Sequence, residues 1–278
     1  MGTITLGNTA ITHTDGSLQY KNVEEREFYI YNSNYWTPLN GGACCLWTVP
    51  AGTTSIKFEL LSGGGPGGSS GGDYDGGTGG QGGNYTVKSL TRAAAGFVPG
   101  TSQYTICAAG SSDCSCCCSC NMNCRHGCTS FVTGPGLSNF CAIGGMGGST
   151  SWDIMSSCYN CFIGNVQCSV GNFNAGWVNH VCNSPTYGGD IEFRGTSGSM
   201  KRTQPDCCAD IHGVAGSPSG PFAAWHGVSG KHACVGNLAC CSHHAVFPGG
   251  GGGPHTTAST DACWGSFGAG GLVRVTYS

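Results

Sequence analysis

Cysteine is the residue type in this chain with the greatest capacity for chemistry. The chain has 278 residues, and 21 of them are Cys. Outside the densest group of cysteines, three pairs of adjacent cysteines and one CxxC are spread along the chain. The densest group lies in the stretch CSCCCSCNMNCRHGC and consists of Cys114, Cys116, Cys117, Cys118, Cys120, Cys124 and Cys128.

Three kinds of chemistry are open to these thiols. Soft thiolates bind zinc and iron–sulfur centres, and His126 lies inside the group. The spacing matches no zinc ribbon, which has two CxxC-type pairs separated by roughly 15–20 residues. Disulfides and packed reduced thiols are the other two interpretations, and the sequence does not show which cysteines would pair. Each reading makes the cysteines structural, and zinc or iron is the one cofactor that the sequence suggests.

The sequence predicts no catalytic residues, and we expect the protein not to be an enzyme. It contains no GxSxG nucleophile elbow and no GxxxxGK[ST] phosphate-binding loop. The 14 acidic residues are scattered, so no pair of carboxylates stands out as a glycosidase site. Cys and His are so numerous that a close pair of the two is expected by chance.

Composition excludes several further classes of protein. Charged residues make up 9% of the chain and the formal net charge is -3, which argues against binding nucleic acid through phosphate contacts. No stretch approaches the roughly 20 apolar residues that cross a membrane. Aromatic residues make up 10% of the chain, unlike ordinary disordered sequences.

Glycine is the other dominant residue, with 51 occurrences. Residues 63–83 read GGGPGGSSGGDYDGGTGGQGG, and most side chains there recur every third residue, as at Thr78, Gln81 and Asn84. A period of three is that of the polyproline II conformation, which makes no internal hydrogen bonds. Gly-rich pieces recur at 144–148, 249–253 and 268–271. A flexible linker would not recur between strands, so we predict an array of polyglycine II-like segments paired through their backbones.

Short strands are expected to frame this array. Alternating or β-branched stretches predict strands at 3–6, 28–31, Ser55–Leu61, 84–90, 103–107 and Leu272–Tyr277. The last strand is expected to pair with the opening strands and close the domain. The predicted fold class is therefore mostly β, with a short-strand framework, polyglycine II-like segments, long irregular loops and few or no helices.

Two regions are expected. Residues 1–43 hold few glycines and no Cys, which predicts an attachment or oligomerisation segment, the alternative being an extension packed on the main domain. Residues 44–278 form the predicted glycine-rich, cysteine-rich β domain. The start of the chain lacks the pattern of a secretion signal. Together with the many cysteines, this predicts synthesis in a host cytoplasm followed by release within a particle.

Long stretches between the strands carry aromatic residues that suit binding, because ordered aromatic side chains give contact area at low entropic cost. The alternative for each is packing within its own loop. The candidates for a binding contact are Tyr74, Trp152, Trp177, Tyr187 and Trp225.

The order of the motifs is distinctive. The sequence VPAGTTSI at 49–56 leads into a strand and then a Gly-rich loop, followed by GGNY at 82–85. A Pro99-Gly100 turn precedes YTI at 104–106, and the chain ends in GLVRVTY. This order resembles the glycine-rich domain at the distal end of bacteriophage tail-fibre proteins. The polyglycine loops also look like those of receptor-binding adhesins at fibre tips. The resemblance covers 44–278 and is strongest at both ends, while the cysteine content departs from it.

The resemblance implies a virion structural protein of a tail fibre or another appendage. It implies a homotrimer that joins other virion proteins through residues 1–43 and presents loops to a receptor on the host cell surface, without binding nucleic acid or inserting into a membrane. The alternatives are a non-receptor component of the same particle (neck, baseplate or capsid surface), an ice-binding protein and a cysteine-rich metal-binding protein.

Overall fold

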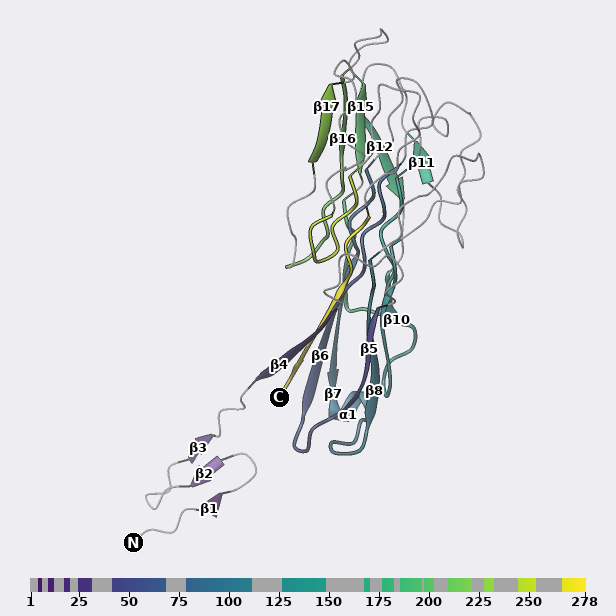
Figure 1. Ribbon diagram of the computed structural model, residues 1–278. Coiled ribbons are helices and arrows are strands. Elements are labelled where there is room, and N and C mark those ends of the chain that lie inside the picture. Colours follow the sequence, from purple (N-terminus) through teal and green to yellow (C-terminus); the bar gives the residue numbers. More distant parts are fainter. Residues whose placement is uncertain are drawn as a thin grey trace.

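The structure is a computed structural model, and a β-sandwich forms its base (Figure 1). It describes residues 5–6, 10–12, 18–20, 25–31, 42–68, 79–111, 127–148, 168–170, 177–182, 186–196, 198–202, 210–221, 228–232, 245–253 and 267–278.

The sandwich consists of two five-stranded antiparallel sheets. The first has the order β14-β7-β6-β18-β4 and contains β14 (Ile191–Phe193), β7 (Tyr85–Thr91), β6 (Ser55–Leu61), β18 (Leu272–Tyr277) and β4 (Arg26–Tyr31). The second has the order β13-β10-β9-β8-β5 and contains β13 (Thr186–Tyr187), β10 (Phe140–Ala142), β9 (Ser130–Thr133), β8 (Gln103–Ala108) and β5 (Ala43–Thr48).

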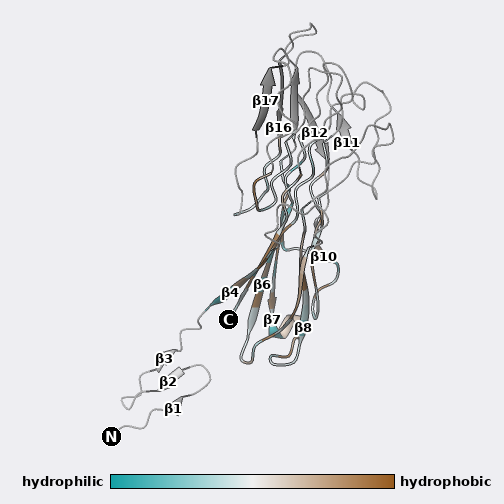
Figure 2. Ribbon diagram, viewed as in Figure 1, coloured by the Kyte–Doolittle hydropathy of each residue, from teal (hydrophilic) through white to brown (hydrophobic). Residues whose placement is uncertain are grey.

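The hydrophobic core lies between these sheets. Alternation in β6 turns Ile56, Phe58 and Leu60 to one face, where they are almost fully buried. They meet buried residues of the second sheet, and the ring centroids of Phe58 and Tyr104 lie 5.1 Å apart. Hydrophobic stretches along β6 are visible in Figure 2. The predicted mostly-β fold class is confirmed.

The last strand pairs with opening strands of the chain, as predicted. β18 lies between β6 and β4 and pairs antiparallel with both, so that Val275 is opposite Phe58 on one side and Phe28 on the other. β4 belongs to the segment predicted to serve attachment or oligomerisation, yet it pairs along its whole length with β18. The division of the chain at residue 44 stays a prediction.

Two short elements complete the lower end of the molecule in Figure 1. A three-stranded meander contains β1 (Thr5–Leu6), β2 (Ala10–Thr12) and β3 (Leu18–Tyr20). Helix α1 (Arg92–Ala95) follows β7, is capped by the Thr91 hydroxyl and ends at Gly96, whose φ is 67°. Within the described ranges, no helix is long and apolar enough to cross a membrane.

A third five-stranded antiparallel sheet, the distal sheet, lies at the opposite end of the molecule from β1–β3 (Figure 1). Its order is β11-β12-β15-β16-β17, and its strands are β11 (Cys168–Val170), β12 (Trp177–Cys182), β15 (Ser199–Arg202), β16 (Asp210–Val214) and β17 (Val228–His232).

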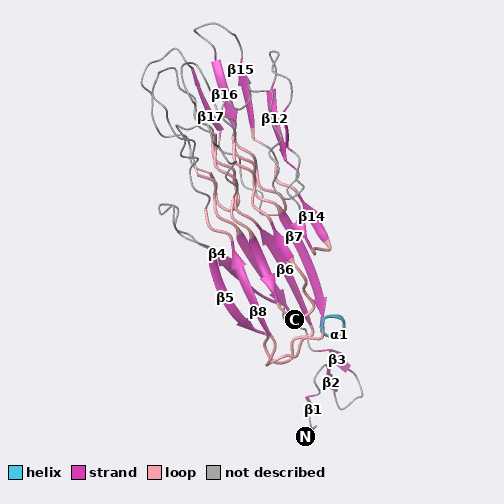
Figure 3. Ribbon diagram, turned by 90° about the vertical axis from the view of Figure 1, so that its right-hand side faces the viewer, coloured by secondary structure: helices cyan, strands magenta, loops and turns pink. Residues whose placement is uncertain are grey.

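Glycine-rich segments connect the sandwich to the distal sheet. In Figure 3 they run as loops between the two groups of strands. Segments 62–68 and 79–84 continue β6 and β7 beyond the sandwich, and 215–220 continues β16 from the distal sheet. We call these three segments, together with the pieces that bond to them, the glycine array. The further pieces are 127–128, 143–148, 194–196, 249–253 and 268–271.

Candidate functional site

Segment 62–68 lies at the centre of the glycine array. Gly65 N donates to Gln81 O at 2.8 Å, and Gly252 N donates to Gly65 O at 2.8 Å. Other backbone bonds join this segment to the pieces that contain Cys128, Gly145 and Ala269. A β-strand bonds to no more than two neighbours in its sheet, whereas this segment bonds to five. The array is therefore a bundle of backbones and not a sheet.

Segment 79–84 is a second centre of the same kind. Its backbone bonds reach five segments, through partners at Gly65, Met146, Thr196, Gly216 and Gly252. The buried backbone donors and acceptors of these glycines thus find partners in other glycine-rich segments, as they must. Backbone pairing of the Gly-rich segments was predicted from the sequence. The polyglycine II helical form of the segments stays a prediction.

Close contact between backbones explains why glycine is required here. A Cβ atom added at Gly65 would lie 1.9 Å from Met146 O, and one added at Gly82 would lie 2.0 Å from Ser217 O. Real Cβ atoms essentially never come within 3.0 Å of such an atom. The carbonyl group of a neighbouring segment occupies the volume that a side chain would need.

The side-chain amides of Gln81 and Asn84 connect two segments of the array by hydrogen bonds. Gln81 Nε2 donates to Gly195 O at 3.1 Å, and Met146 N donates to Gln81 Oε1 at 3.2 Å. Asn84 repeats the pattern three residues later, with Nδ2 donating to Ile143 O at 2.7 Å and Gly195 N donating to Oδ1 at 3.1 Å. Both side chains join segment 143–148 to segment 194–196. Their common direction agrees with the three-residue spacing in the sequence.

A buried charged cluster lies where the sandwich meets the array. Glu59 in β6 is only 3% exposed. Arg274 in β18 is its direct neighbour in the register, and Arg274 Nε donates to Glu59 Oε2 at 2.6 Å. Tyr85 OH donates to Glu59 Oε1 at 2.5 Å, and Lys57 Nζ lies 3.3 Å from Oε2. Each carboxylate oxygen therefore has a strong donor.

The electrostatics of this cluster favour one fixed protonation state. Burial raises the pKa of Glu59, but the hydrogen bonds from Tyr85 and Arg274 and the nearby positive charges outweigh burial and hold the pKa below its usual value. Burial, followed by the bond to the carboxylate, raises the pKa of Tyr85 well above its usual value. At neutral pH the carboxylate is therefore charged and the phenol is protonated, so Glu59 and Arg274 form an ion pair.

The sequence analysis missed Glu59 and Arg274. A signal was present, because each is the single residue of its charge type in its predicted strand. The two strands were expected to pair, and antiparallel pairing sets one charge opposite the other. Aromatic side chains lie close by, and the ring of Phe193 stacks on that of Tyr85 with centroids 6.2 Å apart.

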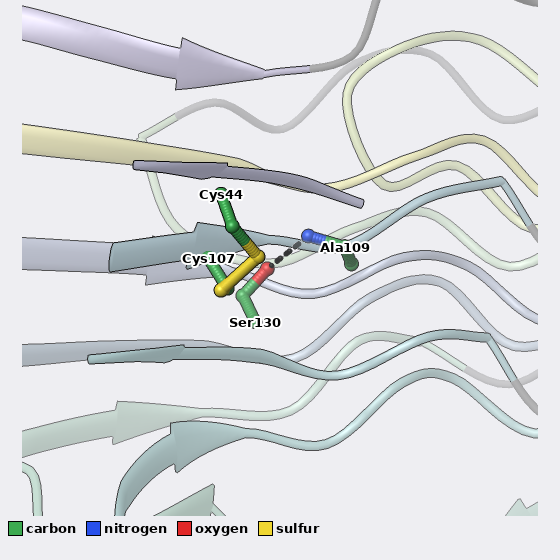
Figure 4. The surroundings of a disulfide bond; sticks show 4 residues. All are labelled: Cys44, Cys107, Ala109 and Ser130. Atoms are coloured by element: carbon green, nitrogen blue, oxygen red, sulfur yellow. Dashed lines mark hydrogen bonds between the residues drawn. A yellow bond between two sulfur atoms is a disulfide. The ribbon is translucent and has the colours of Figure 1, made fainter. Parts of the chain in front are cut away.

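One disulfide is present in the part of the chain that the structure describes. Cys44 of β5 and Cys107 of β8 are directly opposite in the register and are bonded. Figure 4 shows Ser130 beside this bridge. Ser130 Oγ accepts from Ala109 N at 2.9 Å and donates to Leu61 O at 2.8 Å, which joins the two sheets where the array begins.

Of the predicted cysteine group, Cys128 alone falls within the described residues. Its Sγ donates to Ser111 O at 4.0 Å. Cys114, Cys116, Cys117, Cys118, Cys120 and Cys124 lie outside the described residues. Among the side chains that the structure describes, no three His, Cys, Asp or Glu residues gather in a way that could hold a metal ion. Zinc or iron binding by the dense cysteine group stays a prediction.

Two of the five candidate receptor residues fall in described elements. Trp177 begins β12 in the distal sheet, opposite Lys201. Tyr187 ends β13 in the sandwich, opposite Cys141. They belong to different sheets. Tyr74, Trp152 and Trp225 lie outside the described residues.

Comparison with models of known protein families shows what the chain is similar to. A family model described as a glycine-rich domain matches residues 39–278. The match includes both sheets of the sandwich except β4, the glycine array and the distal sheet. No curated protein matches the chain.

Proposed function

Because the chain belongs to the glycine-rich domain family, we propose that it is a structural protein of a bacteriophage virion. In this proposal it forms part of a tail fibre or another appendage and presents loops to the host cell surface. The observation that carries the proposal is the glycine array, which joins the sandwich to the distal sheet by backbone hydrogen bonds.

The array suits the display of loops because it is held from many sides. A backbone hydrogen bond makes a net contribution of roughly 1 kcal/mol to the stability of the fold. Segments 62–68 and 79–84 each bond to five neighbouring segments. Binding loops work best on a rigid scaffold. Since glycine side chains fill no space, the backbones themselves form the rigid part, and the residues beyond the array can vary without disturbing it.

The positions of the termini support an orientation for this scaffold. β1–β3 and the C-terminal end of β18 lie on the side of the sandwich away from the distal sheet (Figure 1). Attachment to other virion proteins through residues 1–43 would point the distal sheet outwards. The segments that contain Trp152 and Trp225 precede β11 and β17 of that sheet. In this proposal they contact the host receptor, and a homotrimer of the chain forms the appendage.

Labelling and competition test the proposal together. Antibodies against the purified chain, bound to gold, would be imaged on phage particles by electron microscopy. The purified chain would also be added to host cells before the phage. We expect label at the tip of a fibre or appendage and slower phage adsorption in the presence of the chain.

Matched variants locate the binding surface. Trp152→Ala and Trp225→Ala are expected to weaken the competition. Leu46→Ala, which alters a side chain of the sandwich that is 63% exposed, is expected to leave the competition unchanged. Label at the neck, baseplate or capsid without competition would favour the non-receptor structural role. Absence of label from the particles would overturn both roles.

A further inference from the structure

Two cysteines occupy directly opposite positions in the register of the distal sheet. β11 and β12 pair antiparallel, with Cys168 opposite Cys182, Ser169 opposite Val181 and Val170 opposite His180. Directly opposed residues of an antiparallel pair have Cβ atoms roughly 4.5–5.5 Å apart. Disulfides need Cβ atoms roughly 3.5–4.5 Å apart. The two ranges meet at about 4.5 Å, so this register position is one at which a disulfide can form with a small adjustment.

The same chain contains a bonded example of this arrangement. Cys44 and Cys107 are also directly opposed in an antiparallel pair, and they form a disulfide with a Cα–Cα distance of 4.1 Å. Among the strand pairings that the structure describes, these are the two places where Cys stands opposite Cys.

The position of β11 explains what a disulfide to β12 would stabilise. β11 has three residues and lies at the edge of the distal sheet, where β12 is its single neighbour. So short an edge strand has few hydrogen bonds to hold it in the sheet. A covalent link between the first residue of β11 and the last residue of β12 would hold this edge in register.

We propose that Cys168 and Cys182 form a disulfide that closes the β11–β12 hairpin. The thiols react with a small-molecule disulfide such as oxidised glutathione. The thiolate of one cysteine attacks a sulfur of the small disulfide and expels a small thiolate. The second cysteine, as its thiolate, attacks the protein sulfur of the mixed disulfide and expels another small thiolate. The two cysteines are oxidised to one S–S bond, and the small disulfide is reduced to two thiols. This inference does not depend on the virion role.

Peptide mapping tests the bond directly. The purified full chain, exposed to oxidised glutathione, would be unfolded, alkylated without reduction and digested with chymotrypsin. Phe173 and Trp177 lie between the two cysteines, so cleavage there separates Cys168 from Cys182. We expect a two-chain peptide that contains both cysteines and that separates on reduction. A link from either cysteine to a different partner, or alkylation of both, would overturn the proposal.

Thiol counting provides a second readout. A bridge predicts that Cys168→Ser and Cys182→Ser each expose one thiol more than the wild type, while the double variant exposes the same number as the wild type. Cysteines without the bridge would instead lose one thiol in each single variant and two in the double variant, which would overturn the proposal. The matched series at Cys44 and Cys107 provides the positive control. If a variant fails to fold, the peptide map of the wild-type chain still decides.

Discussion

Replacing Gly65 by Ala tests whether close backbone contact determines where glycine occurs. The new Cβ would lie 1.9 Å from Met146 O, whereas real Cβ atoms stay at least 3.0 Å away. Segments 62–68 and 143–148 must therefore separate by 3.0 − 1.9 = 1.1 Å. Overpacking of this kind costs about 1–3 kcal/mol. Separation also strains the two 2.8 Å hydrogen bonds that join Gly65 to Gln81 and Gly252. A buried group that loses its partner costs roughly 1–3 kcal/mol. We expect Gly65→Ala to lower the free energy of unfolding by about 3–5 kcal/mol.

Gly270→Ala is the matched control within the same array. The nearest atom to its added Cβ is Ala109 O at 3.1 Å, a contact that a small shift relieves. Alanine also reduces the entropy of the unfolded chain, which stabilises the fold by roughly 0.4–1 kcal/mol. We therefore expect a change within about 1 kcal/mol. Urea unfolding, followed by circular dichroism and tryptophan fluorescence, measures both variants. Equal stability of the two variants would refute the packing argument.

Three further changes probe the bonds around the array. The double variant Cys44→Ser with Cys107→Ser removes the disulfide between two residues that are 63 positions apart in the sequence. It is expected to lower the free energy of unfolding by about 4 kcal/mol. Gln81→Ala leaves one buried backbone N–H and one buried carbonyl group without their side-chain partner, and we expect a loss of about 2–4 kcal/mol. Glu59→Gln is expected to weaken the loss of stability on acidification. The folded-state pKa of Glu59 is lowered, so its contribution is complete above the ordinary value of 4.5 and disappears as the pH falls through the folded-state pKa. Unfolding free energies, measured in urea over a range of pH for the last variant, check all three.

Each of these changes has a control. The double cysteine variant is compared with reduced wild-type protein, and a wild type that loses no stability on reduction would contradict the first expectation. Gln103→Ala removes an exposed bond to Thr48 and is expected to cost under about 1 kcal/mol. A loss as large as that of Gln81→Ala would count against the bridging role. An unchanged acid dependence in Glu59→Gln would show that another group causes it.

The sequence predicted features that depend on local spacing. Alternation in Ser55–Leu61 identified the buried face with Phe58, because one face of a strand repeats every second residue. The three-residue spacing put Gln81 and Asn84 in the same register of their segment, and both bridge the same pair of segments.

Features that depend on distant partners were not predictable. Because glycine has no side chain, the residues around Gly65 do not indicate which backbone it contacts. Its bonds to Gln81 and Gly252 therefore could not be predicted. Cysteine pairing has the same limit, since Cys44 could bond to any of the others until the β5–β8 register is known. The register of β5 and β8 supplied the partner of Cys44, and the packing of the glycine array supplied the partners of Gly65.

Amide hydrogen exchange tests the central claim most directly. Backbone bonding on several sides predicts that the amides of 80–83, together with Gly64 and Gly65, exchange slowly, at rates close to those of β6 and β7 in the sandwich. Exchange would be followed by mass spectrometry of peptic peptides from the purified chain. Exchange of these glycines at the rate of an unstructured peptide, while β6 and β7 remain protected, would contradict the account.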